Sequence, residues 1–586
     1  MTKIIFKKSL FLAIFFGSFL LWQDALAADY YVAQTSVGSG NGSSCANADI
    51  YTDLTWGTGN MIAAGDTLHI CGTIESAAGT TLLSVGASGE AGNVITIKFE
   101  EDAILQSPRF SGGTGIYGGA IYVNAKSYIT IDGGINGIIQ NTDNGTVLGY
   151  RAGSNGVFLR NSDHIEVKNL NIKNIFMPAT VTGINSVYST ETATDSLGRD
   201  MATIGVRIDM RATNLTTGAS SSDGISAVSG STFTISGVTF NEGDSWKVME
   251  TNPSSKGFAI YLNGTSNTSV HDNDIEYCSS GLNVTSYNNE NIELYNNSIK
   301  YCAMGVYAGT GNTGYGLDNI SIHNNIISDN EVFGYNDGIK FTGQGSANNI
   351  TQVHIYNNEI GPNIGTATSL IMADHANYTD AVHGPLIYNN LLLLGNEKPA
   401  NALQLGGYSS SETSACAYEF YNNTLVSLYS ASTLGLRFTY GATGNKVKNN
   451  VILYPNSTGA VYAFSIDGNA TMSESDNNIF YVPNGNLTFF DSVAQTFSTW
   501  KSNHPTFDAN SLNTNPSLSA AYKPDLESDP TVGAGANLTD LGIVTLNSDK
   551  DGIARPASGN WDIGAYEYVG AADTIAPASP TGLSVN

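Results

Sequence analysis

The sequence predicts an all-β fold, a single-stranded parallel β-helix in which short strands wind into one rising coil. The first observation is a recurring phrase: an apolar residue, a polar residue, Asn-Asn or Asp-Asn, any residue, and an apolar residue. Its second Asn recurs at steps of 24, 28, 33, 32, 33 and 27 residues, at positions 273, 297, 325, 358, 390, 423 and 450. Such intervals are typical of stacked repeats. The second observation is that the apolar runs between these phrases alternate without a helical period, which indicates strands.

The paired Asn has two physical uses at the corner of such a coil. Asn tolerates the left-handed backbone conformation that a sharp corner requires. Its side-chain amide can also bond the equivalent amide one coil away, as in stacks of identical segments. We therefore expect the Asn pairs to lie above one another. Other repeat folds fit less well, because a β-propeller blade needs about 40–45 residues and a leucine-rich repeat needs Leu at the fixed positions.

Composition limits the partners of this 586-residue chain. The formal net charge is -26, although only 13% of the residues are charged. An acidic, polar surface of this kind argues against nucleic acid as a partner. It would also repel a polyanionic substrate unless a local basic cluster or a bound cation compensates.

The first 27 residues are interpreted as a secretory signal peptide. A basic start at residues 3–8 precedes an apolar run at residues 10–22, and residues 25–27 have the form of a cleavage site. The apolar run is too short to span a bilayer comfortably. We therefore expect a secreted or surface protein, monomeric and without a membrane span after cleavage.

Export permits disulfide bonds, and two pairs of cysteines suit them. Cys45 and Cys71 flank the first folded unit. Cys278 and Cys302 are 24 residues apart, which is the coil step at that point, so they should lie one above the other. Adjacent strands are about 4.8 Å apart, within reach of a disulfide. A buried stack of two thiols is an equally good interpretation of the second pair.

The start of the mature chain resembles a known superfamily. Tyr30-Tyr31-Val32 is followed by Gly65-Asp66-Thr67-Leu68 and by an alternating run at residues 94–99. This order resembles the N-terminal cap and first coils of secreted right-handed parallel β-helix proteins of the pectin-lyase-like superfamily. The resemblance implies a right-handed coil. We expect a cap and first coils at residues 28–125 and the main β-helix at residues 126–480.

Two stretches depart from the repeat. No Asn-Asn phrase occurs within about residues 176–257, and the run at 232–240 followed by 243–248 predicts a β-hairpin or small β-module inserted into the helix. In the C-terminal segment, residues 481–570, the runs at 549–556 and 561–568 closely resemble the choice-of-anchor Q segment that ends many bacterial surface or secreted β-helix proteins. We expect this segment to cover the exposed edge of the last coil.

The remaining features of this end are minor. Residues 571–586 have the composition of a linker tail. Asp549, Asp551 and Asp562 could bind Ca²⁺, but a structural turn is the favoured interpretation of these three residues.

One strand of each repeat supplies a predicted binding face. Each repeat contains a triplet of a small, an apolar and a variable residue, such as Gly305-Val306-Tyr307. Since the apolar middle residue points inward, strand alternation directs the third residue outward. The third positions then form one exposed column: Asn283, Tyr307, Lys340, Met372, Gln404 and Arg437. Two residues further along, Thr342 and Asp374 join the same face.

This column and the loop after Asp374 contain the candidate site residues. The candidate catalytic side chains are Lys340, His383 and Arg437. The candidate substrate-binding side chains are Tyr307, Gln404 and His375. The candidate Ca²⁺ ligands are Asp337, Asp374 and Asp380. We predict that Lys340, Asp374 and Arg437 share one exposed face.

These residue types fit a lyase that cleaves a uronic-acid-containing polysaccharide by β-elimination. Arg437 or Ca²⁺ would neutralise the sugar carboxylate, and Lys340 or His383, with a lowered pKa, would abstract the neighbouring proton. The resemblance agrees, since lyases of the pectin-lyase-like superfamily use Lys or Arg bases and often Ca²⁺. A glycoside hydrolase would need two carboxylates, such as Asp337 with Asp374 or Asp380. A non-catalytic adhesion or glycan-binding protein at the cell surface is the third alternative.

Overall fold

The computed structural model describes residues 27–112, 117–143, 153–175, 257–285, 287–302, 304–310, 315–329, 337–343, 350–362, 369–374, 384–395, 401–407, 417–431 and 433–570. It also gives the backbone of the strands between residues 180 and 250. Residues 1–26, within the expected signal peptide, and residues 571–586, the expected linker tail, lie outside the described residues.

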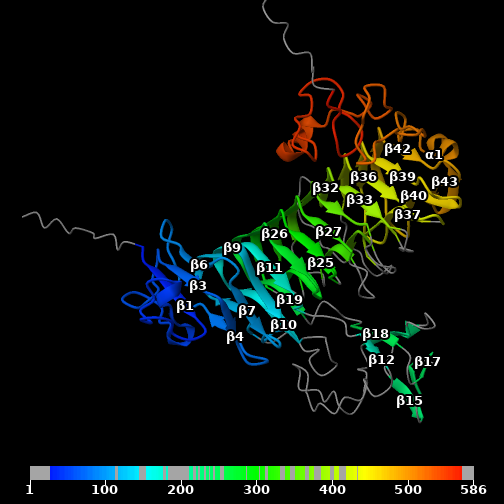
Figure 1. Cartoon of the computed structure of the whole chain (residues 1–586). Coiled ribbons are helices and arrows are strands. Elements are labelled where there is room, and N and C mark those ends of the chain that lie inside the picture. Colours follow the sequence, from blue (N-terminus) through cyan, green and yellow to red (C-terminus); the bar gives the residue numbers. More distant parts are fainter. Residues whose placement is uncertain are drawn as a thin grey trace, which may run out of the picture.

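The chain forms one long parallel β-helix with three strands in each coil (Figure 1). In a typical coil, β20 (Ser266–His271) leads through the Asn corner to β21 (Asp274–Glu276), and β22 (Ser280–Thr285) completes the turn. The next coil repeats this order with β23 (Asn289–Tyr295), β24 (Ser298–Lys300) and β25 (Met304–Thr310), each paired in parallel with its equivalent. The predicted all-β solenoid is confirmed. We call the three sides of the coil face one, face two and face three, in chain order.

Every face is a ladder of equivalent strands. Face one also contains β3 (Thr67–Ile70), β6 (Ile95–Phe99), β26 (Leu317–His323), β29 (Ile350–Tyr356), β32 (Leu386–Tyr388), β35 (Glu419–Tyr421), β38 (Asn445–Lys448) and β41 (Met472–Asp476). Face two contains β4 (Thr73–Glu75), β7 (Ile104–Ser107), β27 (Ile326–Ser328), β30 (Glu359–Ile360), β33 (Leu391–Leu394), β36 (Thr424–Ser427), β39 (Val451–Leu453) and β42 (Ile479–Tyr481). The long strands β9 (Ser127–Asn141) and β11 (Asp163–Lys173) run through both faces.

Face three is a separate sheet. It contains β5 (Leu83–Ser84), β8 (Ile121–Asn124), β10 (Ser154–Arg160), β19 (Gly257–Asn263), β28 (Asp337–Gly343), β31 (Ile371–Asp374), β34 (Leu403–Leu405), β37 (Leu434–Phe438), β40 (Ala460–Ile466) and β43 (Asn486–Asp491). The first strand of the chain, β1 (Asp29–Ala33), pairs with β2 (Asp49–Ile50) and β3. The described strands at the start of the chain therefore pair into the same sheets as the later coils, within residues 28–125, where a cap and first coils are expected.

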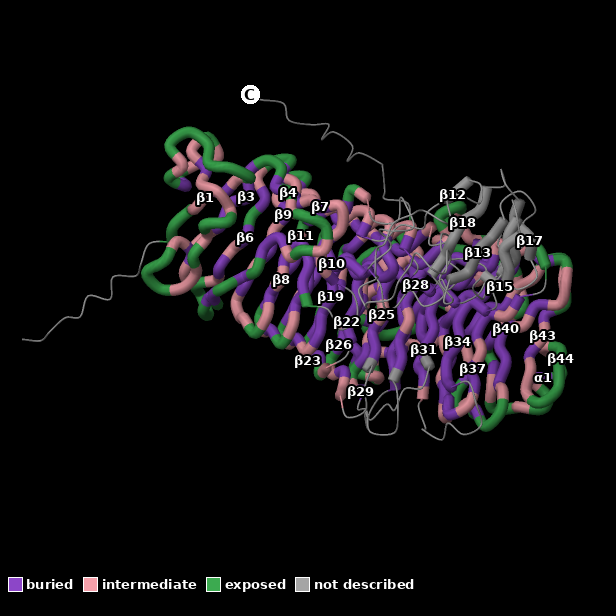
Figure 2. Tube along the Cα trace, turned by 90° about the horizontal axis from the view of Figure 1, so that it is seen from below, coloured by how far each residue is buried: buried purple, intermediate pink, exposed green. Residues whose placement is uncertain are grey.

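Strand alternation fills the interior with stacked aliphatic side chains. Val270, Leu294, Ile322 and Ile355 are aligned in successive coils, and each is at most 2% exposed. One core cluster extends in this way from Val32 to Trp500. In Figure 2 the buried residues follow the strands along the length of the coil, while exposed residues gather in the loops.

The second Asn of each pair builds a ladder through the corner. Each side-chain Nδ2 donates to the Oδ1 of the equivalent Asn one coil on, at 2.9–3.1 Å, through residues 273, 297, 325, 358, 390, 423, 450 and 478. Each backbone N–H donates to the same Oδ1, as Asn325 does to Asn358 at 3.0 Å. These side chains are at most 2% exposed. The predicted vertical file of asparagines is confirmed, including the corner at Asn478.

The first residue of each pair has the other role. Its φ lies between 49° and 60° at every corner, at Asp272, Asn296, Asn324, Asn357, Asn389, Asn422, Asn449 and Asn477. This is the left-handed region, which Asn and Asp tolerate better than most residues. The two residues of each pair therefore have different roles: the first forms the bend, and the second forms the hydrogen-bonded ladder.

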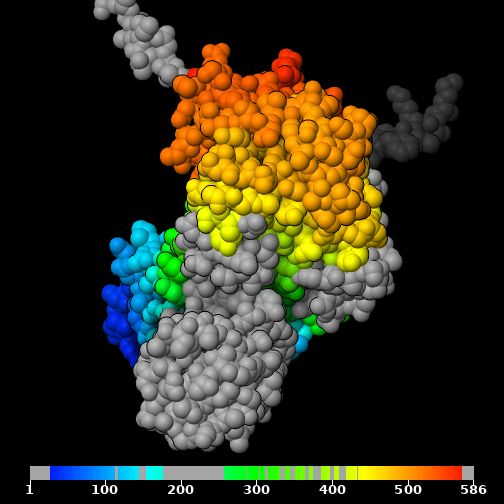
Figure 3. All heavy atoms as spheres, turned by 90° about the vertical axis from the view of Figure 1, so that its right-hand side faces the viewer, coloured from blue at the N-terminus to red at the C-terminus, as the bar shows by residue number. Residues whose placement is uncertain are grey.

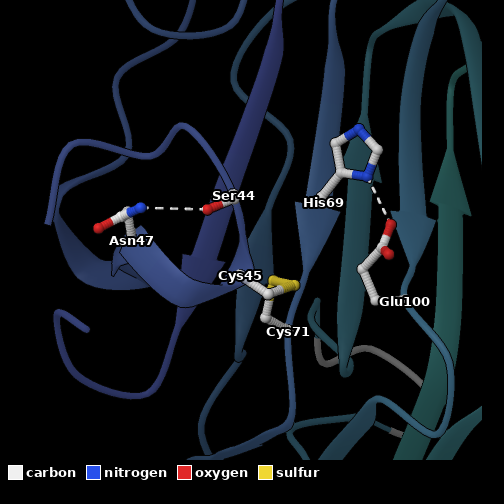
Figure 4. The surroundings of a disulfide bond; sticks show 6 residues. All are labelled: Ser44, Cys45, Asn47, His69, Cys71 and Glu100. Carbon is white, nitrogen blue, oxygen red and sulfur yellow. Dashed lines mark hydrogen bonds and ion pairs between the residues drawn. A yellow bond between two sulfur atoms is a disulfide. The ribbon is translucent and has the colours of Figure 1, made fainter. Parts of the chain in front are cut away.

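Two disulfides are present, one near the start of the chain and one near its middle. Cys45, in the short helix η1 (Cys45–Asn47), is bonded to Cys71 (Figure 4). Cys278 is bonded to Cys302 one coil away, with 4.6 Å between their Cα atoms. Beside the first bond, His69 Nδ1 lies 2.6 Å from Glu100 Oε1. A second short helix, η2 (Tyr51–Asp53), completes this N-terminal region.

The stretch inserted after Ile175 contains two small antiparallel sheets. One consists of β12 (Thr180–Thr182), β13 (Met210–Asn214), β14 (Ser220–Ser221) and β18 (Ser245–Glu250), and the other of β15 (Ile225–Ser229), β16 (Thr232–Ile235) and β17 (Val238–Asn241). The predicted hairpin is present as the antiparallel pair β16–β17. The chain then returns to the coil at β19, on face three.

A short C-terminal element closes the core. The strand β44 (Val493–Thr496) pairs antiparallel with β43, and α1 (Phe497–Asn503) follows, with the Thr496 side chain accepting from Thr499 N at its start. Trp500 is fully buried against Phe464 and Phe489, with ring centroids 5.1 and 5.4 Å away. This part covers the end of the last coil, as expected.

The rest of the C-terminal segment does not cover the edge of the last coil, contrary to our expectation. Residues 533–567 do not cap the end but lie along the side of four earlier coils, over their Asn corners (Figures 1 and 3). The left-handed Asn residues, whose amides the ladder does not use, hold this segment through its carbonyls: Asn389 to Ser548, Asn422 to Asp562, Asn449 to Ala536 and Asn477 to Ala534, at 2.7–3.0 Å.

Apolar burial supports the same arrangement. Trp561 and Leu546, each 0% exposed, pack with Tyr388 and Tyr421 on the outside of face one. Two short helices, η6 (Thr539–Leu541) and η7 (Val544–Asn547), belong to this segment. Among the described residues, no helix is long and apolar enough to cross a membrane.

Candidate functional site

The predicted column lies in a single file on face three. The parallel register aligns Asn283 with Tyr307, Tyr307 with Lys340, and so on through Met372, Gln404 and Arg437. Thr342 is aligned with Asp374 in the neighbouring column. The register therefore places Lys340, Asp374 and Arg437 in the sheet of face three, and the side chain of Asp374 lies outside the described part of the structure. Their catalytic and binding roles stay predictions.

The column is less exposed than expected. Asn283, Met372 and Gln404 are only 0%, 5% and 8% exposed, and the prediction of a fully solvent-facing file is wrong for these three positions. The physical reason is the coil spacing, since strands about 4.8 Å apart bring each side chain into contact with its neighbours above and below. Tyr307 and Lys340 keep intermediate exposure.

The last residue of the file, Arg437, forms an ion pair. Arg437 Nε donates to Asp467 Oδ2 at 2.8 Å, and the Arg437 side chain is 39% exposed. Lys340 and Arg437 are separated by three coil steps, about 14 Å along the axis. A sugar unit beside Lys340 would therefore not meet Arg437, whose charge is in any case shared with Asp467. This geometry weakens the expectation that Arg437 neutralises the carboxylate at the reacting sugar.

The acidic candidates are only partly described. Asp337 is 2% exposed, and its Oδ1 accepts from Ser369 N at 3.2 Å. Asp374 ends β31. His375, Asp380 and His383 lie outside the described residues.

Within the described part of the chain, no group of three or more His, Cys, Asp and Glu side chains is placed to hold a metal ion. The acidic residues of the C-terminal segment form a turn. Asp549 Oδ1 accepts from the backbone N–H groups of Asp551 and Ile553, at 2.9 and 2.7 Å. Asp562 binds Gly533 N and Tyr568 N in the same manner. These contacts match the favoured interpretation of a structural turn.

The predicted column omits an aromatic extension of the same file toward the N-terminus. Tyr122, Phe158 and Tyr261 are aligned with one another, and Tyr261 is aligned with Asn283. The rings of Phe158 and Tyr261 stack with centroids 4.6 Å apart and 6° between their planes. With Phe258 they form a small apolar cluster separate from the main core.

A signal for this extension is present in the sequence. Ala120-Ile121-Tyr122, Gly156-Val157-Phe158 and Ala259-Ile260-Tyr261 each repeat the small, apolar and variable triplet that defines the predicted column. These triplets lie before the first clear Asn-Asn phrase or beside the inserted stretch. The register of the repeat could not therefore be carried back to them by counting.

Comparison with known proteins supports the fold. The profile of a family described as "Right handed beta helix region" matches residues 155–380. No curated protein matches the sequence. The chain is a right-handed parallel β-helix, as the strand pairing and this profile together show.

Several solved structures are similar to this chain at low identity. Pectate lyase Pel9A is 11% identical, with 93% of this chain and 97% of that chain covered and a TM-score of 0.32. An exopolygalacturonase from Thermotoga maritima is 9% identical, with coverages of 74% and 85% and a TM-score of 0.34. The surface adhesin PfbA of Streptococcus pneumoniae is 10% identical, with coverages of 73% and 81% and a TM-score of 0.36.

Proposed function

We propose that the protein binds an extended polysaccharide along face three, outside the cell of a bacterium. The observation that carries this proposal is the single file of aromatic, amide and cationic side chains, from Tyr122 to Arg437, aligned by the parallel register. Its members repeat at about 4.8 Å along a straight axis, which suits a linear polymer. Aromatic faces can stack on sugar rings, and amides can bond hydroxyl groups.

Within this file we propose Lys340 as the base of a β-elimination on a uronic-acid-containing chain. Lys340 lies in the middle of the file, directly beside Tyr307. Because Arg437 is about three coils away and paired with Asp467, neutralisation of the sugar carboxylate would depend on Ca²⁺ held by Asp374 and Asp380, since the third expected ligand, Asp337, is buried. His383 is the alternative base.

The lyase is favoured over the glycoside hydrolase on one observation. A hydrolase needs two carboxylates that face the scissile bond. Asp337 is buried, and one of its oxygens accepts a backbone N–H from Ser369. It is better placed to support the strand than to donate a proton to a substrate. The remaining alternative is a non-catalytic protein that binds the polysaccharide through the same file of side chains but does not cleave it.

The test combines binding with product detection. The mature chain is incubated with polygalacturonate, alginate and a neutral glucan, with Ca²⁺ or with a chelator, and ultraviolet absorbance of unsaturated product is followed. Lys340→Ala should abolish product, whereas Lys98→Ala on face one, an exposed lysine, should not. Binding without product, unchanged by Ca²⁺ removal, would support the non-catalytic alternative. Absence of binding to every polymer would refute the proposal.

A further inference from the structure

The N-terminal end of face three contains a cation in an aromatic setting. Arg160 ends β10, one column away from Phe158. Its guanidinium carbon lies 3.9 Å from the centroid of the Tyr117 ring. Tyr117 is 50% exposed and also stacks on Phe158, with centroids 6.3 Å apart. An exposed ring is thus held in place by a cation on one side and an aromatic cluster beside it.

The charge of Arg160 has no acidic partner in the described structure. Burial alone would lower the pKa of Arg160, but hydrogen bonds with Tyr122 and Tyr287 raise it above its ordinary value. None of the described carboxylates lies within ion-pair distance of the guanidinium. In a chain with a formal net charge of -26, a partly buried cation without a counter-charge is a favourable site for an anion.

Unpaired polar atoms surround the same place. Asn124, Arg160 and Asn263 form one column, and Asn283 lies in the next. Asn124 Oδ1, Arg160 Nε, Asn263 Oδ1 and Asn283 Nδ2 are all buried without a hydrogen-bond partner. Buried polar atoms ordinarily have partners, and each one without a partner costs about 1–3 kcal/mol. Four such atoms within two adjacent columns indicate a place prepared for polar groups that come from outside the chain.

We infer that Tyr117, Arg160, Asn263 and Asn283 form a subsite for an acidic sugar unit, a unit that carries a carboxylate or a sulfate. The anionic group pairs with Arg160, and the sugar ring lies against the exposed Tyr117. This inference rests on the proposed function, because it concerns the same face. Arg160 is four coil steps from Lys340, about 19 Å along the axis, so an anionic group at Arg160 and Lys340 contact different units of one polymer.

The experiment measures dissociation constants by calorimetry for the mature chain. The ligands are polygalacturonate, its fully methyl-esterified form and a sulfated galactan. The variants are Tyr117→Ala, Arg160→Gln, Lys340→Gln and Lys98→Gln, the last removing one positive charge from face one. We expect Tyr117→Ala and Arg160→Gln each to weaken binding of the preferred acidic polymer by about tenfold. Lys98→Gln should change it by less than about twofold.

The outcomes separate this inference from the proposed function. Loss of binding in Lys340→Gln together with wild-type affinity in Tyr117→Ala and Arg160→Gln would overturn the subsite alone. Equal losses on the esterified and acidic polymers would overturn its preference for an anion. No binding by the wild-type chain would overturn both. Preference for the polyuronate or for the sulfated galactan identifies the anionic group. If Arg160→Gln lowers the melting temperature strongly, Tyr117→Ala, at an exposed position, decides the result.

Discussion

Removal of one rung from the asparagine ladder should destabilise the protein far more than a change at the adjacent residue. The perturbation is Asn325→Ala, and the matched control is Asn324→Gly in the same corner. Asn325 Oδ1 accepts from Asn297 N and Nδ2, each at 3.0 Å. Its Nδ2 donates to Leu294 O, His323 O and Asn358 Oδ1. Asn324 has a φ of 55°, which glycine adopts without strain.

The magnitude follows from these contacts. Asn297 is 1% exposed, so its backbone N–H would be left buried without an acceptor, at a cost of about 1–3 kcal/mol. The bonds to the two carbonyls add about 1 kcal/mol each. We therefore expect Asn325→Ala to lower the free energy of unfolding by about 3–5 kcal/mol. Asn324→Gly should change it by less than about 1 kcal/mol, because two effects oppose each other. Glycine loses more conformational entropy on folding, but it adopts the left-handed conformation without strain.

The assay is urea unfolding followed by circular dichroism on both variants and the wild-type chain. The midpoint of Asn325→Ala should fall clearly below that of Asn324→Gly at a similar slope. Equal midpoints for the two variants would show that the ladder contributes nothing beyond the bend itself. The assignment of separate roles to the two asparagines would then be wrong.

Three further predictions concern the disulfide, a buried ion pair and a buried acid. Cys278→Ser should cost about 3 kcal/mol, because the bond to Cys302 closes a loop of 24 residues; an unchanged melting temperature would contradict it. Arg555→Met should release the C-terminal segment, since it leaves Glu567 buried without its ion-pair partner; hydrogen exchange of residues 533–568 should rise, and Glu567→Gln in the same chain should restore part of the protection. Burial raises the pKa of Asp508, so protonated Asp508 stabilises the folded state relative to the ionised form. This stabilisation is complete below the ordinary pKa of Asp and is lost as the pH rises through the raised pKa. Asp508→Asn should flatten this part of the stability profile, measured by thermal unfolding between about pH 3 and pH 7, and an unchanged slope would count against it.

The architecture could be predicted from the sequence because each repeat contains, within a few residues, the Asn pair that forms its corner. An Asn pair that appears at every corner reports both the bend and the spacing, so Asn273 and Asn450 could be placed in one file by counting. The same count aligned Tyr307 with Lys340 and Gln404 with Arg437. A period of strands therefore predicts which residues 24–33 positions apart lie side by side, without any tertiary information.

Other features depend on contacts that the period does not contain. The burial of Gln404 follows from neighbours in adjacent coils, and the pairing of Arg437 with Asp467 follows from a residue two positions beyond its column. The position of residues 533–567 depends on amides of left-handed asparagines, whose free side chains look the same in the sequence at every corner. The subsite at Arg160 was missed because its triplets precede the clear repeat.

The attachment of residues 533–567 has a consequence for the order in which the molecule is built. Asn389, Asn422, Asn449 and Asn477 belong to four consecutive turns, yet all four are tied to a strap, residues 533–567, that is synthesised after them. The upper turns can stack beforehand, but they are fastened together only when synthesis of the strap is finished. The lower turns have no such fastening among the described residues. A chain truncated near residue 530 should therefore retain its coil but unfold first at the C-terminal turns. The two ends of the β-helix would then differ in stability because only the C-terminal turns depend on the strap.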